Sequence, residues 1–103
     1  MAETVQQVFD ELPARADPDR LRGEHVSYRF DVTDVGSWRV EVHDGDLAVS
    51  RSHDDADLVV ETDEATFLKI ANREQNPALA YMTGKVKVRG DTGLALRLRD
   101  FFA

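Results

Sequence analysis

Three segments in the first half of the chain alternate apolar and polar residues so regularly that they limit what the chain can fold into. Side chains that alternate with a period of two lie on opposite faces of a β-strand. The clearest segment is His25–Val32, and Trp38–Val42 and Leu47–Val49 repeat its pattern. The apolar residues of these segments are Val26, Tyr28, Phe30, Val32, Trp38, Val40, Val42, Leu47 and Val49. We therefore expect three strands, each with one apolar face.

The turns between these segments predict how the strands pair. Asp44-Gly45 is a strong hairpin signal, because both positions of a type I′ turn need residues that tolerate positive φ. Residues 34–37 are typical of the preceding turn. We expect an antiparallel meander with one apolar face and one solvent-exposed face that carries Ser27, Arg29 and Asp31.

Two more strands follow. Leu58–Val60 is apolar on both faces, which is typical of a strand inside a sheet. Val86 and Val88 alternate with basic residues in the last strand.

Helix signals surround the strands. Thr4 and Gln7 have the spacing of a capping box, and the apolar stripe that follows is Val5, Val8, Phe9 and Leu12. Residues 62–64 and 76–77 begin two short helices, and residues 94–102 have the spacing of a last helix. The order is therefore helix, three-strand meander, strand, two short helices, strand, helix. It predicts an α+β fold, with helices on one face of a five-stranded, mainly antiparallel sheet.

Composition restricts the class of function. A chain of 103 residues predicts one domain, residues 1–103. The absence of cysteine excludes disulfides and thiolate chemistry, and no apolar run approaches the ~20 residues of a membrane helix. We thus expect no stable membrane insertion and, without an export signal, a cytoplasmic protein. The net charge of −7 argues against binding nucleic acid. It fits either ordinary solubility or an acidic surface adapted to high salt.

The residues that carry catalytic or metal chemistry are sparse. His53 beside Asp54 and Asp55 is the only metal-like cluster, and no partner spacing supports it. No serine lies in a Gly-x-Ser-x-Gly elbow. The glycines near the C-terminus lack the spacing of a phosphate loop, so we assign Gly84, Gly90 and Gly93 to chain geometry. We expect no catalysis, no metal and no cofactor.

Large apolar residues concentrate in the last forty-odd positions. They are Phe67, Leu68, Ile70, Leu79, Met82, Val86, Val88, Leu94, Leu98, Phe101 and Phe102. They either fill a core or line a space that takes a ligand. Beside them, Lys85, Lys87 and Arg89 form a basic cluster, which is either a docking patch for an anionic group or the charge that protects an edge strand.

The block Pro77–Asp91, followed by Gly93–Leu98, resembles the signature of the sterol carrier protein (nonspecific lipid-transfer) domain family. Upstream, Gly36-Ser37-Trp38, Asp44-Gly45 and Asp63–Phe67 follow the family's order, so the resemblance covers the whole chain. It implies an apolar tunnel between the sheet and the helices that binds fatty acid, acyl-CoA, sterol or isoprenoid ligands. The apolar residues above would form its walls, and the basic cluster would hold a headgroup. Since the family also includes accessory and dimerisation domains of enzymes, a filled core with a homodimer or protein partner stays open as the alternative.

Overall fold

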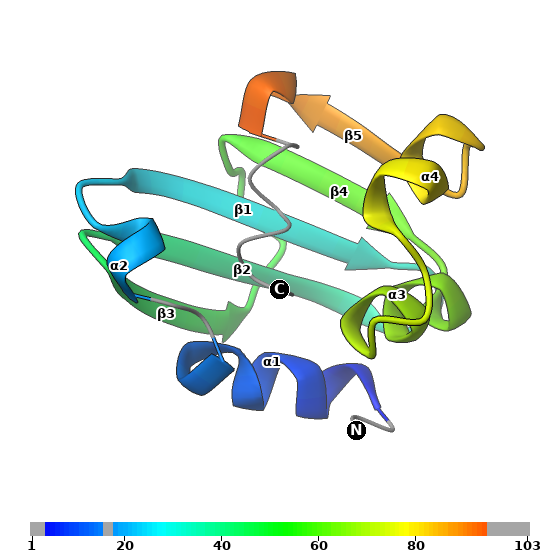
Figure 1. The fold of residues 1–103 in the computed structure, drawn as a ribbon, viewed down its shortest axis with the longest axis horizontal. Coiled ribbons are helices and arrows are strands. Elements are labelled where there is room, and N and C mark those ends of the chain that lie inside the picture. The colour runs from blue at the N-terminus through cyan, green and yellow to red at the C-terminus, as the bar shows by residue number, and fades with distance from the viewer. Residues whose placement is uncertain (1–3, 16–17, 95–103) are drawn as a thin grey trace.

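A computed structural model describes residues 4–15 and 18–94 of the chain (Figure 1). Its elements are α1 (Val5–Arg15), α2 (Pro18–Leu21), β1 (His25–Val32), β2 (Gly36–His43), β3 (Asp46–Arg51), β4 (Leu58–Thr62), α3 (Glu64–Ala71), α4 (Pro77–Met82) and β5 (Val86–Gly90). The predicted order of elements is confirmed as far as β5, except that the four-residue helix α2 lies between the first helix and β1 and was not in the predicted order. The last predicted helix lies outside the described residues, apart from Leu94.

The five strands form one sheet in the order β3-β2-β1-β4-β5. All neighbours are antiparallel except β1 and β4, which run parallel. The sheet is therefore mixed but mostly antiparallel, and β4 lies inside it as its apolar sequence predicted. Leu58 and Val60 are buried on one face of β4, and Val59 is buried on the other.

The local signals in the sequence account for the ends of the elements. The Thr4 hydroxyl accepts a hydrogen bond from the Gln7 amide, and the Thr4 amide donates to Gln7 Oε1, both at 3.1 Å. The Asp63 and Asn76 side chains cap α3 and α4. Asp44 and Gly45 have φ values of 49° and 94°, so both turn residues take the positive φ that the β2–β3 hairpin requires.

Helices cover the apolar face of the sheet (Figure 1). The buried side of α1 consists of Val5, Val8, Phe9 and Leu12. Its Phe9 ring stacks on Trp38 of β2 with ring centroids 4.9 Å apart and on Phe67 of α3 at 5.3 Å. Phe30 of β1 adds a tilted contact at 5.4 Å from Phe9. An aromatic cluster thus joins the first helix, the sheet and α3. No helix among residues 4–15 and 18–94 is long and apolar enough to cross a membrane.

Candidate functional site

The predicted lipid-binding residues fall into three groups by exposure. Phe67, Ile70 and Val86 are buried in the core. Leu68, Val88 and Leu94 are partly buried and pack against it. Leu79 and Met82 of α4 are exposed, at 55% and 78%. Leu98, Phe101 and Phe102 lie outside the described residues. The described members therefore run from the core, through a partly covered layer, to the surface.

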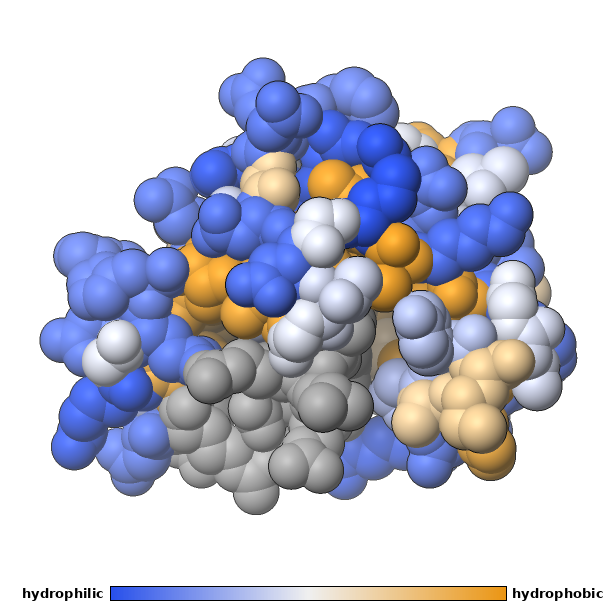
Figure 2. Space-filling model, turned by 90° about the horizontal axis from the view of Figure 1, so that it is seen from above, coloured by the Kyte–Doolittle hydropathy of each residue, from blue (hydrophilic) through white to orange (hydrophobic). Residues whose placement is uncertain are grey.

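The helix α4 carries the exposed end of this series. Its residue Ala80 is fully buried, whereas Leu79, Tyr81 and Met82 expose about half or more of their surface. Figure 2 shows apolar surface at the corner of the molecule where α4 lies, and a further apolar band across the middle of the same view. Tyr81 was not among the predicted residues, because its position in a six-residue helix does not distinguish the buried face from the exposed one. The contact between α4 and β5 places these side chains next to the last strand.

The basic cluster lies at the start of and along that last strand, since Lys85 directly precedes β5 and Lys87 and Arg89 belong to it. Lys85, Lys87 and Arg89 are all exposed, and β5 is an edge strand of the sheet. Arg89 Nη2 lies 3.6 Å from Glu61 Oε1 of β4, so part of its charge is balanced by a neighbour. An edge position is required both for a headgroup patch and for an edge strand protected by charge. The position of the cluster is therefore compatible with both interpretations.

The opposite face of the sheet is less exposed than the sequence predicted. Residues 52–57, which connect β3 to β4, cross it and cover Ser27 and Arg29, whose exposed fractions are only 8% and 5%. The Ser27 amide donates to Asp57 Oδ2 at 2.9 Å, and the Asp57 amide donates to the Ser27 hydroxyl at 3.0 Å. Arg29 Nη1 donates to the carbonyl of His53 at 3.0 Å. The expectation of a solvent-exposed face is therefore wrong for the middle of β1.

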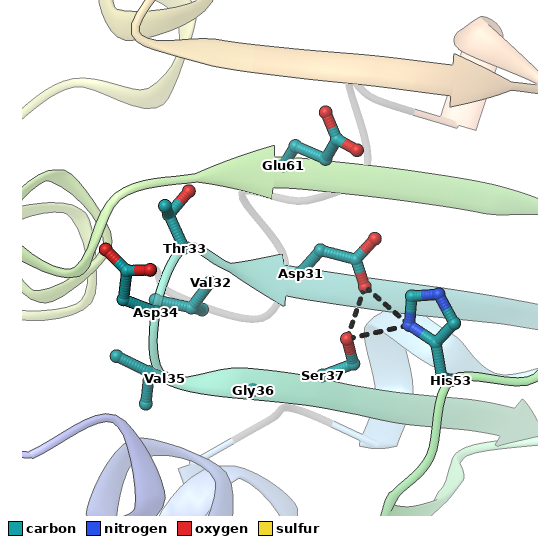
Figure 3. A pocket seen from close by; sticks show the side chains of 9 residues that line it. All are labelled: Asp31, Val32, Thr33, Asp34, Val35, Gly36, Ser37, His53 and Glu61. Carbon is teal, nitrogen blue, oxygen red and sulfur yellow. Dashed lines mark hydrogen bonds and ion pairs between the residues drawn. The ribbon is translucent and has the colours of Figure 1, made fainter.

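A polar network lies under this connection (Figure 3). Arg29 donates to both oxygens of Asp31, from Nε and Nη2, each at 3.0 Å. The Ser37 hydroxyl lies 2.7 Å from Asp31 Oδ1 and 3.0 Å from His53 Nδ1. Burial raises the pKa of Asp31, but hydrogen bonds from Arg29 and Ser37 and the positive charge of Arg29 outweigh it and leave the pKa below its usual value. Asp31 therefore stays ionised and accepts hydrogen bonds at neutral pH.

The network opens on a surface pocket of about 420 Å³. The polar residues that line it are Asp31, Thr33, Asp34, Ser37, His53 and Glu61. Three carboxylates make it a poor site for a lipid tail, and it lies on the face of the sheet that Asp31, Ser37 and Glu61 share, away from the predicted lipid-binding residues.

The Ser37, His53 and Asp31 side chains do not have the arrangement of a hydrolytic triad. In a triad the histidine uses one ring nitrogen for the serine and the other for the carboxylate. Here the same atom, His53 Nδ1, lies 3.0 Å from the Ser37 hydroxyl and 3.8 Å from Asp31 Oδ1. Because an ionised carboxylate can only accept, the Ser37 hydroxyl donates to Asp31 and accepts from His53. The network thus holds the 52–57 connection on the sheet.

The hairpin register could have revealed part of this network. Asp31 and Ser37 are direct partners across the β1–β2 pair, and Arg29 and Asp31 are two apart on one strand, so all three share a face. His53 gave no such signal, because a connection without regular structure does not show which face it crosses.

Comparison with known proteins places the chain in a family. The chain belongs to the SCP-2 sterol transfer family, whose sequence profile matches residues 5–103. Hydroxysteroid dehydrogenase-like protein 2 of Xenopus tropicalis is 28% identical over 98 residues, which cover 91% of this chain and 24% of that protein. The chain thus spans about a quarter of the length of this relative.

Solved structures share the fold. The solution structure of palmitated SCP2L2 from Aedes aegypti matches 92% of this chain and 90% of its own, with a TM-score of 0.75 and 20% identity. The sec-alkylsulfatase Pisa1 from Pseudomonas sp. matches 91% of this chain with a TM-score of 0.77 and 26% identity, over 15% of its own length. The α+β fold predicted from the sequence is therefore confirmed, and similar regions occur both as nearly whole chains and as parts of longer proteins.

Proposed function

We propose that this chain is a non-catalytic module that binds a hydrophobic lipid, such as a fatty acid, acyl-CoA, sterol or isoprenoid, between the helices and the apolar face of the sheet. The observation that carries the proposal is the match to the SCP-2 sterol transfer family over nearly the whole chain. One structural relative is the palmitated SCP2L2 of Aedes aegypti, which supports an acyl chain as one ligand.

The distribution of apolar side chains supports a site near α4 and β5. The cluster around Phe9 is closely stacked, so the region under α1 and α3 is filled by aromatic rings. Leu68, Val88 and Leu94 are only partly buried, and Leu79 and Met82 are exposed. We infer that a lipid tail lies against the partly buried residues and that the exposed ones flank its entry. Lys87 and Arg89 lie on the face of β5 that Glu61 shares, so we infer that the basic cluster attracts an anionic headgroup around the β5 edge of the sheet.

The free energy gained by burying a lipid tail is sufficient for binding, but it gives little selectivity between tails of different length. Burying a tail of about sixteen carbons at about 0.8 kcal/mol per CH₂ gains on the order of 10 kcal/mol. The association cost of about 4–15 kcal/mol is subtracted from this gain. Because one methylene more or less changes affinity little, we expect micromolar binding with broad tolerance of chain length.

A direct experiment is native mass spectrometry of the protein purified from cells, followed by titration with a fluorescent fatty acid. We expect co-purified lipid and saturable binding at one site. Met82→Glu places a charge beside the inferred entry and should weaken binding several-fold. Ala48→Glu adds the same charge at an exposed position of β3 and should leave binding unchanged. Absence of both co-purified lipid and saturable binding would exclude the proposal.

The second candidate is an accessory or dimerisation module with a filled core. It is favoured by one observation, namely that similar regions make up only 24% and 15% of two longer relatives whose names are those of a dehydrogenase-like protein and a sulfatase. Sedimentation equilibrium distinguishes the candidates. A concentration-dependent dimer together with no lipid binding would favour the second one.

A further inference from the structure

Two histidines face each other at the end of the β1–β2 pair that is remote from the pocket. His25 and His43 are direct partners in the antiparallel register, although 18 residues separate them in the sequence. Both are exposed. Their Nδ1 atoms lie 2.8 Å apart, and the ring centroids lie 4.6 Å apart with the planes at 62°. One ring donates this hydrogen bond and the other accepts it, so a metal ion that replaced the shared proton would have two imidazole ligands on the surface.

This separation is close to what a shared metal ion requires. Imidazole nitrogen is a preferred ligand of zinc, copper and nickel. With Zn–N bonds of about 2.0–2.1 Å, two ligands at a tetrahedral angle lie about 3.3 Å apart, and two at a right angle lie about 2.9 Å apart. The His25 and His43 rings would have to separate by about half an ångström or less, which side-chain rotation on the surface can supply.

The backbone holds the pair in place. The Gly23 amide, two residues before His25, donates to Asp44 Oδ1 at 2.7 Å. The Asp44 amide, directly after His43, donates to the Glu24 carbonyl at 2.8 Å. These two bonds tie the chain before His25 to the chain after His43 in addition to the strand pairing. A site on such a frame loses little freedom when it binds an ion.

A carboxylate lies next in the same row. Asp46 of β3 is the register partner of His43, so His25, His43 and Asp46 share one face across three strands. Among the described residues no cluster of three His, Cys, Asp or Glu side chains is arranged to hold a metal ion. Asp46 therefore adds negative charge and can accept from a metal-bound imidazole or water, while water fills the remaining positions of the ion.

We propose that His25 and His43 form a binding site for a divalent transition-metal ion, with Asp46 as its outer partner. The site is independent of lipid binding, since it lies on the opposite face of the sheet. This proposal departs from the sequence-based expectation of no metal site. That expectation rested on spacing along the sequence, which does not reveal that a hairpin brings His25 and His43 together.

Zinc titration tests the proposal, because the chain contains only three histidines. Isothermal titration of the full chain with Zn²⁺ in a non-chelating buffer would be compared for the wild type and the variants His25→Asn, His43→Asn and His53→Asn. We expect one ion per chain, at least a tenfold loss of affinity for His25→Asn and His43→Asn, and an unchanged affinity for the control His53→Asn. Zinc should also raise the thermal unfolding midpoint of the wild type and the control only.

The proposal is overturned if the wild type binds no zinc, or if His53→Asn weakens binding as much as the other two. Retention of wild-type affinity in both His25→Asn and His43→Asn would overturn it as well. Circular dichroism checks that each variant is folded, and since both side chains are exposed we expect no loss of structure.

Discussion

The guanidinium of Arg29 meets the carboxylate of Asp31 through two parallel hydrogen bonds, each 3.0 Å long, on the face of β1 that the 52–57 connection covers. Only 6% of the Arg29 side chain and 18% of the Asp31 side chain are exposed. The same guanidinium donates to the His53 carbonyl. One side chain thus joins the strand to the connection, and its fork geometry suits this arrangement.

Replacing Arg29 by Met should destabilise the protein by about 3 kcal/mol, because it leaves the Asp31 charge and the His53 carbonyl without this partner. Urea denaturation measures the change. Arg22 forms a matched pair with Asp19, but the two side chains are 74% and 79% exposed. Arg22→Met should cost less than about 1 kcal/mol. Equal losses of unfolding free energy for the two variants would mean that burial of the Arg29–Asp31 pair does not contribute to stability.

Asp31 should also make stability depend on pH. Its folded-state pKa is lowered, so its contribution is fully present above the unfolded value of about 3.9 and is lost as the pH falls through the folded value. The difference in unfolding free energy between wild type and Asp31→Asn should be constant from about pH 7 to 5 and shrink below about pH 4. Denaturation curves at a series of pH values measure it. A difference that does not change on acidification contradicts the account.

Gly90 should tolerate substitution less well than Gly84. Both have positive φ, 103° and 80°, so alanine is strained at either position. A Cβ at Gly84 meets nothing within 4 Å, whereas a Cβ at Gly90 would collide with the Asp57 carbonyl oxygen, which accepts a 2.8 Å hydrogen bond from the Asp91 amide. Gly84→Ala should cost about 1–2 kcal/mol from backbone strain alone. Thermal unfolding should show a clearly larger loss for Gly90→Ala, and similar losses would mean that the approach of β5 to Asp57 is not tight.

Replacing Phe67 by Ala tests whether its ring is packed in the core or borders empty space. Its ring stacks on Phe9 at 5.3 Å and meets Phe30 edge-on at 6.2 Å. Phe67→Ala should therefore cost about 3–5 kcal/mol. Met82→Ala, at a side chain that is 78% exposed, should stay within about 0.5 kcal/mol. A loss below about 1 kcal/mol for Phe67→Ala would show that the ring lines a space rather than the core.

The sequence predicted the elements because each has a local cause. The alternation in His25–Val32, the Asp44-Gly45 turn and the cap at Asp63 each act within a few residues, and all appear in the structure. The internal position of β4 followed from its apolar residues on both faces. The parallel pairing of β1 with β4 had no local signal, since it depends on how the chain crosses the sheet.

The features that the sequence did not reveal arise from chain segments that meet only in the fold. Ser27 and Arg29 alternate like exposed residues, but residues 52–57 lie over them. His25 and His43 are similarly distant in sequence and adjacent in space. For the predicted lipid residues, hydrophobicity identified apolar side chains but could not separate a core residue such as Phe67 from an exposed one such as Met82.

The most direct test of the account is nuclear magnetic resonance of the full chain with a spin-labelled fatty acid, which broadens the signals of residues near the bound tail. We predict saturable broadening at Leu68, Val88 and Leu94, and at Leu79 and Met82 of α4, whereas His43 and Ala48 on the opposite face keep their intensity. Unlabelled palmitate should reverse the effect. No saturable broadening, or equal broadening on both faces of the sheet, would contradict a lipid site between the helices and the sheet.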